Sequence, residues 1–252
     1  MGEVIAVTSG KDGVGKTVIA SNLGVVLAQR KHSVVLMDLN VGSRNLDISL
    51  GLENRVVYDL VDVVTGVCRI KQAMIRDRRF RDLYLISAPQ SRNKAPITEE
   101  QLVALCQELK KIFDFIIIDA PAGAGSALKQ AVSPADRVVV VTVPEYSAIR
   151  DTESINALLE GVGITRRSVV INKIMPELHQ TGLVPGPEEI AEILRTPVSG
   201  LIPYDQNIHI STNVGIPIAT AQESYIAKNL RGIGERIISK IDDLAPDANV
   251  QY

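Results

Sequence analysis

Short apolar segments recur along this chain and alternate with longer segments in which apolar residues return every three or four positions. The short segments are rich in β-branched residues, and two of them, 115–118 and 138–141, are apolar at every position. Strands with two apolar faces are typical of a parallel sheet covered by helices on both sides. The pattern predicts strands at 4–8, 33–38, 83–87, 115–119, 137–143, 168–172 and 198–202.

Helical periodicity fills the intervals between these strands. It predicts helices at 17–30, 98–112, 125–133, 147–161, 187–195 and 222–244, the last with the apolar stripe Ile226, Leu230, Ile233, Ile237, Ile241 and Leu244. Such alternation of strands and helices predicts one doubly wound α/β domain with a mostly parallel sheet and the fold of a P-loop NTPase. We assign 1–244 to this domain and 245–252 to a flexible C-terminal end.

Composition and charge narrow the function classes. The chain has 252 residues, 46% of them hydrophobic, which suits one large core, and its net charge of −2 gives no global attraction to nucleic acid or anionic lipid. It has neither a long apolar run nor a signal-peptide pattern at its start, so we expect a cytoplasmic protein. Cys68 and Cys106 lack metal-site spacing and are predicted to be buried thiols of a reducing compartment.

A glycine-rich loop follows the first predicted strand and precedes the first predicted helix. It reads Gly10-Lys11-Asp12-Gly13-Val14-Gly15-Lys16-Thr17, the pattern G-x-x-x-x-G-K-T, and Val18 follows it. Its glycines let successive N–H groups point at phosphate oxygens, and the helix start adds positive potential. Lys16 can reach the β- and γ-phosphates, and the Thr17 hydroxyl can ligate Mg²⁺. The loop therefore predicts a nucleotide site.

Two aspartates end predicted strands beside this loop. Asp38 closes the strand at 33–38, and Asp119 closes the strand at 115–119. Acids at the carboxyl ends of neighbouring parallel strands commonly hold metal and water in phosphate-loop proteins. We predict that Thr17, Asp38 and Asp119 surround Mg²⁺. The alternative is that each aspartate caps the turn after its strand.

A second lysine in the loop, Lys11, resembles the deviant Walker A motif of the MinD/ParA-type ATPases. Other segments are similar to the MinD branch, the septum-positioning ATPases of bacteria, and they occur in the family's order between residue 4 and about 240. They are 44–59, Asp119-Ala120-Pro121-Ala122-Gly123, Pro144-Glu145 with Arg150-Asp151, and Ile202-Pro203-Tyr204-Asp205-Gln206. By this resemblance the chain is identified as a member of the MinD branch.

The resemblance implies a sheet of seven to eight strands and a face-to-face homodimer that forms with ATP and hydrolyses it to ADP. By matching positions, Lys11 reaches the partner's phosphates, Asn172 reads the adenine edge, and Pro203 and Asp205 flank the base. A strand-end asparagine is also a common turn former, so a structural role for Asn172 stays open. The residues assigned to catalysis are Lys11, Lys16, Asp38 and Asn40.

The same resemblance places Glu145 and Asp151 on the dimer-facing surface, although charged residues at a helix start are commonly caps. It implies a regulatory partner similar to MinC or MinE, and no specific nucleic acid. The task would be placement of the division site or of related machinery such as a flagellar apparatus.

Three features depart from the family's pattern. Asp12 stands where glycine is usual; its charge lies close to the phosphates, or its side chain bonds its own turn. Asn40 replaces the second acid of an Asp-x-Asp pair and cannot accept a proton at neutral pH, which predicts hydrolysis that is slowed rather than lost. Residues 245–252 are neither basic nor amphipathic, so we expect membrane association only through a partner or a further C-terminal segment.

Two other functions remain open. Asn40 favours a nucleotide-dependent scaffold that does not hydrolyse ATP. A metallocentre-maturation ATPase of the same fold would need a cysteine pair that bridges the dimer. Cys68 lies in a predicted turn and Cys106 on a helical apolar stripe, and both positions indicate structural roles.

Overall fold

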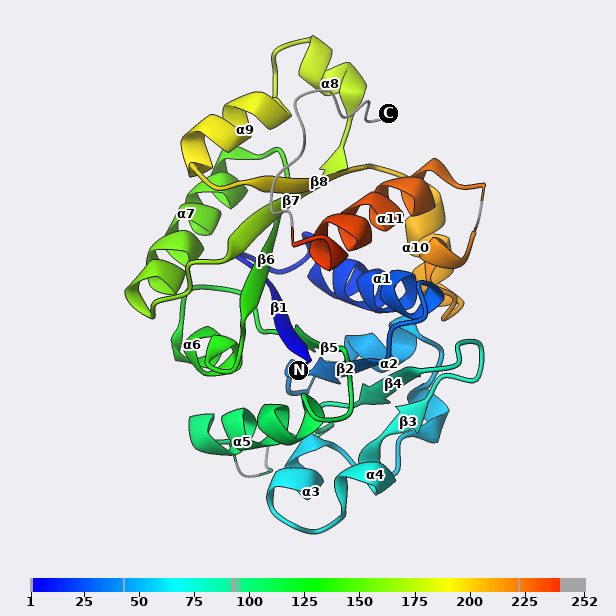
Figure 1. Cartoon of the computed structure of the whole chain (residues 1–252). Helices are drawn as coiled ribbons and strands as arrows, with labels where there is room; N and C mark the ends of the chain where they lie inside the picture. Colours follow the sequence, from blue (N-terminus) through cyan, green and yellow to red (C-terminus); the bar gives the residue numbers. More distant parts are fainter. Residues whose placement is uncertain (1, 43, 92–93, 95, 222, 241–252) are drawn as a thin grey trace.

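The computed structural model describes residues 2–42, 44–91, 94, 96–221 and 223–240. Within them, eight strands form one sheet in the order β3-β4-β2-β5-β1-β6-β7-β8 (Figure 1), and every pairing is parallel except β3 with β4. The strands are β1 (Glu3–Ser9), β2 (Val34–Asp38), β3 (Ile75–Arg76), β4 (Leu83–Ile86), β5 (Phe115–Asp119), β6 (Arg137–Thr142), β7 (Arg167–Ile174) and β8 (Val198–Pro203).

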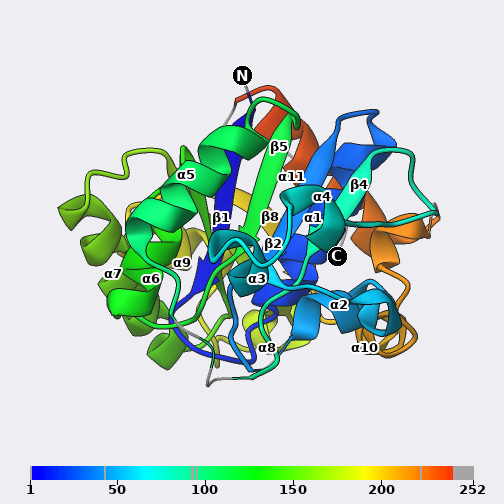
Figure 2. The same ribbon diagram turned by 90° about the horizontal axis from the view of Figure 1, so that it is seen from below.

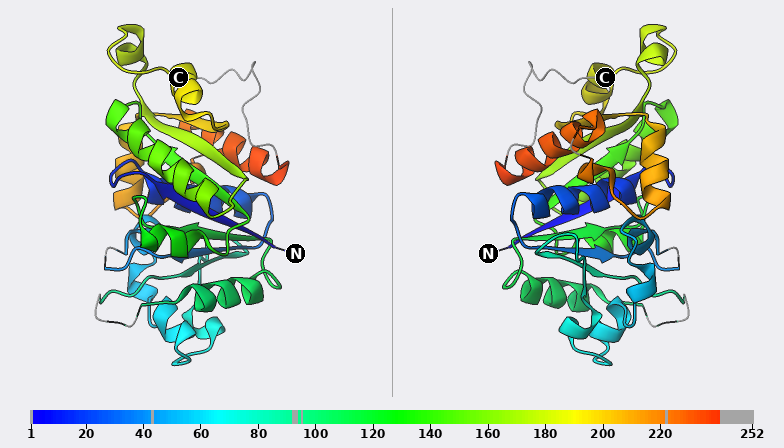
Figure 3. Two further views of the ribbon diagram at one scale, coloured as in Figure 1. Left: turned by 90° about the vertical axis from the view of Figure 1, so that its left-hand side faces the viewer. Right: turned by 90° about the vertical axis from the view of Figure 1, so that its right-hand side faces the viewer.

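Helices cover both faces of the sheet (Figures 1 and 3). One face packs against α1 (Lys16–Gln29), α2 (Asn45–Ser49) and α11 (Tyr225–Ile238). The other packs against α3 (Leu60–Val64), α4 (Ile70–Ala73), α5 (Glu99–Leu109), α6 (Ser126–Val132), α7 (Tyr146–Gly161) and α9 (Pro187–Leu194). Two further helices, α8 (Pro176–Gln180) and α10 (Gln206–Asn213), follow β7 and β8.

Alternate residues of each central strand enter the two halves of the core. In β5, Ile116 and Ile118 pack on the side of α5, α6 and α7, whereas Ile117 packs on the side of α1 and α11. This double burial is why the strands are apolar at every position. The predicted fold class, a doubly wound sheet of seven to eight strands, is confirmed.

The parallel arrangement brings the carboxyl ends of seven strands, all except β3, to one edge of the sheet. Asp38 at the end of β2 and Asp119 at the end of β5 are neighbours in the strand register. The glycine-rich loop leaves β1 at the same edge, between β5 and β6. Ligands of such sheets bind at this edge.

The elements that the sequence pattern did not predict are short. They are β3, α2, α3, α4, α8, α10 and the 3₁₀ turns Glu53–Arg55 and Ile218–Thr220. Segments of two to eight residues carry too little periodicity to identify, and contacts with the rest of the fold determine them.

The last helix is shorter than predicted. It begins at Tyr225 and ends at Ile238, because Ser239 closes its last turn and Lys240 adopts a left-handed backbone, with φ of 58°. Ile241, Leu244 and the predicted flexible end at 245–252 lie outside the described residues. Cys68 and Cys106 are buried free thiols, as predicted. None of the helices within the described ranges is long and apolar enough to cross a bilayer.

Candidate functional site

The glycine-rich loop connects β1 to α1 and depends on its glycines. Gly13 and Gly15 have φ of 81° and 98°, in the left-handed region that favours glycine. A Cβ on Gly15 would lie 2.3 Å from Nδ2 of Asn172, and a Cβ on Gly10 would lie 2.4 Å from Cβ of Asp151. The loop is therefore packed between the end of β7 and α7 too tightly for side chains at these two positions.

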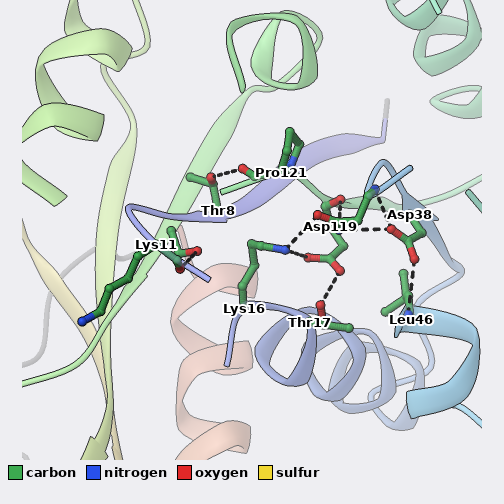
Figure 4. A network of polar contacts seen from close by, with 10 residues as sticks. Thr8, Lys11, Lys16, Thr17, Asp38, Leu46, Asp119 and Pro121 are labelled. Atoms are coloured by element: carbon green, nitrogen blue, oxygen red, sulfur yellow. Dashed lines mark hydrogen bonds and ion pairs between the residues drawn. The ribbon is translucent and has the colours of Figure 1, made fainter. Parts of the chain in front are cut away.

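Lys16 is the loop's inward-pointing lysine. The residue is 7% exposed, and its Nζ donates to Oδ1 of Asp119 at 3.0 Å and to Oδ1 of Asn40 at 3.2 Å. The Thr17 hydroxyl donates to the other carboxylate oxygen of Asp119 at 2.7 Å (Figure 4). The turn that follows Asp119 is held against β1, since the Thr8 hydroxyl donates to the Pro121 carbonyl at 2.9 Å. The loop and the end of β5 thus form one polar unit.

Asp38 lies beside this unit and is fully buried. Its carboxylate accepts hydrogen bonds from the backbone N–H groups of Asn40 at 2.8 Å and Leu46 at 3.3 Å. Burial, together with the nearby charge of Asp119, raises the pKa of Asp38 to about 7. Burial also raises the pKa of Asp119, although Lys16 and Thr17 favour its charged form.

Two buried carboxyl groups with raised pKa values fit a bound cation. Ionised carboxylates and a hydroxyl are the hard oxygen ligands that Mg²⁺ prefers. The structure brings Thr17 into contact with Asp119, whereas Asp38 is linked to Asp119 through Asn40. No cluster of three or more acid, histidine or cysteine side chains within the described part of the chain forms a metal site unaided. A cation here would therefore need oxygens from the nucleotide or water as well.

Asn40 bridges the two halves of this cluster. Its Nδ2 donates to Oδ1 of Asp38 at 3.1 Å and to the carbonyl of Asp119 at 3.2 Å, while its Oδ1 accepts from Lys16. The side chain is half-buried, and both Oδ1 and Nδ2 have hydrogen-bond partners. This position is inconsistent with a solvated side chain in a loop.

A cavity of about 520 Å³ opens beside the loop. That volume lies within the range of small-molecule and cofactor sites. Nine residues that the sequence predicted for nucleotide binding or, in the case of Asn40, for catalysis line it: Asp12, Gly13, Gly15, Lys16, Thr17, Val18, Asn40, Asn172 and Asp205. The lining does not include Gly10, Lys11, Val14, Asp38, Asp119 or Pro203.

Pro203 is the member of the predicted base-flanking pair that does not line the cavity. It is the last residue of β8 and is buried, paired with Ile174 of β7. The next residues, Tyr204 and Asp205, leave the sheet and line the cavity. Of the predicted pair, Asp205 thus lines the cavity, and Pro203 lies two residues before it at the end of β8.

Two residues at the end of β7 hold the middle of the loop. Asn172 is 3% exposed, and its Nδ2 donates to the carbonyl of Val14 at 2.8 Å. Its Oδ1 is buried without a hydrogen-bond partner. Lys173, with φ of 56°, donates from Nζ to the carbonyl of Gly13 at 2.7 Å. The unsatisfied oxygen of Asn172 is an acceptor available to a ligand.

Asp205 caps α10 at the opposite end of the cavity. Its carboxylate accepts from the N–H of Asn207 and from the hydroxyl of Tyr225, both at 2.7 Å. Although burial works in the opposite direction, these bonds lower the pKa of Asp205. Burial and the neighbouring carboxylate raise the pKa of Tyr225 to about 12. Asp205 is therefore an ionised and fixed group.

Lys11 points away from Lys16 and Asp119 (Figure 4), and it does not line the cavity. Its Nζ forms an ion pair with Oε2 of Glu145 at 2.6 Å and a hydrogen bond with the Ser147 hydroxyl at 3.2 Å. Glu145 precedes α7, and Asp151 of the same helix packs on Gly10. The sequence had placed these residues on one surface, and the structure gathers them around the outer end of the loop.

Several lining residues were not predicted from the sequence. They are Ser9, Asn45, Lys173, Tyr204, Ile208, His209, Thr212 and Asn213. Most of them follow the carboxyl ends of strands that were predicted, and this position is the signal that could have found them.

The chain is similar to known nucleotide-binding proteins. The family model of the CobQ/CobB/MinD/ParA nucleotide binding domain matches residues 5–218. The septum site-determining protein MinD of Synechocystis is 44% identical over 88% of this chain and 84% of its own.

Two solved structures are also similar. A chain of the MinC:MinD cell division protein complex of Aquifex aeolicus is 35% identical, with a TM-score of 0.89 over 97% of each chain. MinD of Pyrococcus horikoshii, complexed with Mg-ADP, is 26% identical, with a TM-score of 0.85 over 97% of this chain and 100% of its own.

Proposed function

Because this chain belongs to the CobQ/CobB/MinD/ParA nucleotide-binding family, as a MinD-type deviant Walker A ATPase with adenine nucleotide and Mg²⁺ as cofactors, we propose that it is an ATP-dependent dimerisation switch. ATP favours the dimer, the dimer recruits a partner, and slow hydrolysis returns the monomer. The observation that carries this proposal is the pairing of buried Lys16 with Asp119 beside a nucleotide-sized cavity.

The nucleotide's phosphates occupy the loop from Gly10 to Val18. Lys16 neutralises the β- and γ-phosphates, and the N-terminal N–H groups of α1 point at the same oxygens. Thr17, Asp119 and Asp38 are the residues that would hold Mg²⁺, directly or through water. When bound, Mg²⁺ neutralises the phosphate charge that develops during hydrolysis.

The base lies toward β7 and α10. The buried Oδ1 of Asn172 accepts a hydrogen bond from the exocyclic amino group of adenine. One of the two N–H groups of Nδ2 is bonded to the carbonyl of Val14, and Oδ1 is the acceptor without a partner, so the amide suits the amino group of adenine better than the oxygen that guanine carries at that position. Pro203 and Asp205 flank the base, and Tyr204 between them also lines the cavity.

Asn40 sets the rate of hydrolysis. In our proposal it orients the attacking water but takes no proton from it, and its amide is already bonded to Lys16 and Asp38. Hydrolysis therefore proceeds slowly, by positioning and charge stabilisation alone. The second candidate, a scaffold that does not hydrolyse ATP, is favoured by the same bonds.

Lys11 completes the site of the second subunit. In the monomer it is held by Glu145 on the loop's outer side, and in the ATP dimer it moves to the partner's phosphates. Asp151 and Glu145 then lie on the dimer surface.

The partner we propose is a MinC-like regulator, since one similar structure is a MinC:MinD complex. The task is placement of the division site, in keeping with the septum site-determining relatives.

Gel filtration with ATP, with ADP and without nucleotide tests the switch. We expect a dimer with ATP alone, and a monomer under all three conditions for Lys11→Ala, which should still bind nucleotide. A wild-type elution volume that ATP leaves unchanged would contradict the proposal. Phosphate release in a single turnover then separates the slow ATPase from the scaffold, which would release none.

A further inference from the structure

Arg79 connects three segments that are far apart in the sequence. It lies between β3 and β4, where its guanidinium pairs with Asp77, a residue that is only 2% exposed. The same guanidinium donates to the carbonyl of Gly215 at 2.8 Å and to the carbonyl of Leu50 at 2.5 Å. A planar fork of donors suits such simultaneous contacts, which a lysine cannot reproduce. Arg79 thus joins the end of α2 to the end of α10.

The two joined segments touch through their backbones. Gly51 and Gly215 have φ of 63° and 67°, and each lies where a side chain would clash. A Cβ on Gly215 would be 2.4 Å from Cα of Gly51, and a Cβ on Gly51 would be 2.9 Å from the carbonyl oxygen of Gly215. Figure 2 shows α2 and α10 side by side. This contact leaves little room for the two segments to move independently.

Each segment forms one wall of the nucleotide cavity. We call residues 40–42 and 44–50 the phosphate wall, since Asn40 and Asn45 line the cavity beside Lys16. We call residues 204–213 the base wall, which lines the cavity beyond Asn172. Leu46 ties the phosphate wall to Asp38, and Tyr225 ties the base wall to α11 through Asp205. Arg79 itself does not line the cavity.

We propose that Arg79 is a positioning residue that couples the two walls, so that occupation of the phosphate wall orders the base wall. This inference rests on the proposed orientation of the nucleotide in the cavity. A ligand can stabilise a distant segment when both are linked to one rigid contact, and the coupling is reciprocal. Adenine binding would thereby help to set Asn40 and Asn45 in the geometry that hydrolysis needs.

Amide hydrogen exchange with Mg²⁺ and inorganic tripolyphosphate, which has no base, tests the coupling. In the wild-type chain we expect slower exchange in the loop at 10–18 and also about 5-fold slower exchange in α10. In Arg79→Met the loop should still be protected and α10 should not. Arg79→Lys should restore only part of the effect.

Controls separate coupling from a loss of stability. Arg81 lies in the same connection between β3 and β4, and its side chain is 92% exposed. In Arg81→Met, tripolyphosphate should therefore slow amide exchange in α10 as it does in the wild type. Melting temperatures of all variants show whether the fold is intact. If Arg79 only stabilises its loop, α10 responds equally in Arg79→Met and in the wild type, and the inference is overturned.

The inference and the proposed function fail in different ways. A protected loop with an unresponsive α10 in the wild-type chain overturns the coupling and leaves the nucleotide site intact. An unprotected loop overturns the phosphate assignment and the coupling with it.

Discussion

The two lysines of the glycine-rich loop differ in burial and in their bonding partners. Lys16 is buried and bonded to Asp119 and Asn40 on the cavity side. Lys11 lies on the outer side, where its ion pair with Glu145 joins side chains that are 33% and 59% exposed. We refer to these as the inner and outer ends of the loop.

This difference in burial shows which lysine is available to move. Breaking a buried pair leaves an uncompensated charge and costs about 3–5 kcal/mol, whereas an exposed pair contributes about 0–1 kcal/mol. The inner lysine is therefore committed to its own subunit's site. The outer lysine can exchange Glu145 for another anion, such as the phosphates of a partner subunit, at little cost.

Removal of the inner lysine should have the largest effect. We expect Lys16→Ala to reduce affinity for both ATP and ADP by at least about 100-fold, because it is the lysine that the loop directs to the β-phosphate. Isothermal titration calorimetry measures this, with Lys11→Ala as the matched control that keeps its affinity. Unchanged binding by Lys16→Ala would show that the inner end is not the phosphate site.

Asn40 at the inner end controls turnover. We expect Asn40→Asp to increase kcat, toward the low end of the ~10²–10⁴-fold that a positioned base contributes. The new carboxylate loses the Nδ2 bonds to Asp38 and to the Asp119 carbonyl, and it accepts only from Lys16. Single-turnover rates at saturating ATP provide the measurement. Equal rates would refute a hydrolysis defect caused by the amide.

The buried carboxyl groups at the inner end also predict a pH dependence. A pKa raised from 3.8 to about 7 in Asp38 means that the folded state favours the protonated form. The contribution of this shift to the free energy of unfolding is fully present below about pH 4 and is lost as the pH rises through 7. Without Mg²⁺ or nucleotide, Asp38→Asn should therefore gain about 2–4 kcal/mol relative to the wild type between pH 5 and 8.

Urea unfolding at several pH values measures this gain. Asp82→Asn is the control, because the Asp82 side chain is 43% exposed. A difference between Asp38→Asn and the wild type that does not change with pH would show that Asp38 is ionised throughout.

The sequence pattern identified more of the residues in the glycine-rich loop than of those in the phosphate wall and the base wall. The loop from Gly10 to Val18 and the two aspartates follow from a local motif and from strand ends, because parallel strands bring their carboxyl ends together. Asn45 and α10 belong to short segments whose positions depend on tertiary contacts. Arg79 carries no pattern at all in the sequence, since its partners are carbonyl groups of distant residues.

Asn172 holds the middle of the loop. Removal of the Asn172 side chain should have an intermediate effect on nucleotide affinity. We expect Asn172→Ala to lower ADP affinity by about 10-fold, because a buried acceptor for the adenine amino group and the bond to Val14 are both lost. The preference for ADP over GDP should fall as well. Asn156→Ala is a matched control, since Asn156 is also buried with an unpartnered Oδ1 but does not line the cavity. Fluorescent nucleotide displacement gives both affinities, and an unchanged ADP/GDP ratio would contradict base recognition.

The smallest effect should come from the outer end. Glu145→Gln weakens the ion pair that holds Lys11 in its own subunit, so Lys11 reaches the partner's phosphates more readily. An exposed pair contributes about 0.2–1 kcal/mol, which corresponds to an ATP dimer that is about 1.4- to 5-fold tighter. Sedimentation at several concentrations measures this shift. Glu189→Gln is the control, because it removes a carboxylate that bonds Tyr146 at the start of the same helix without touching Lys11. A weaker dimer in Glu145→Gln would mean that Glu145 itself contacts the partner, and the outer end would then be a fixed part of the interface.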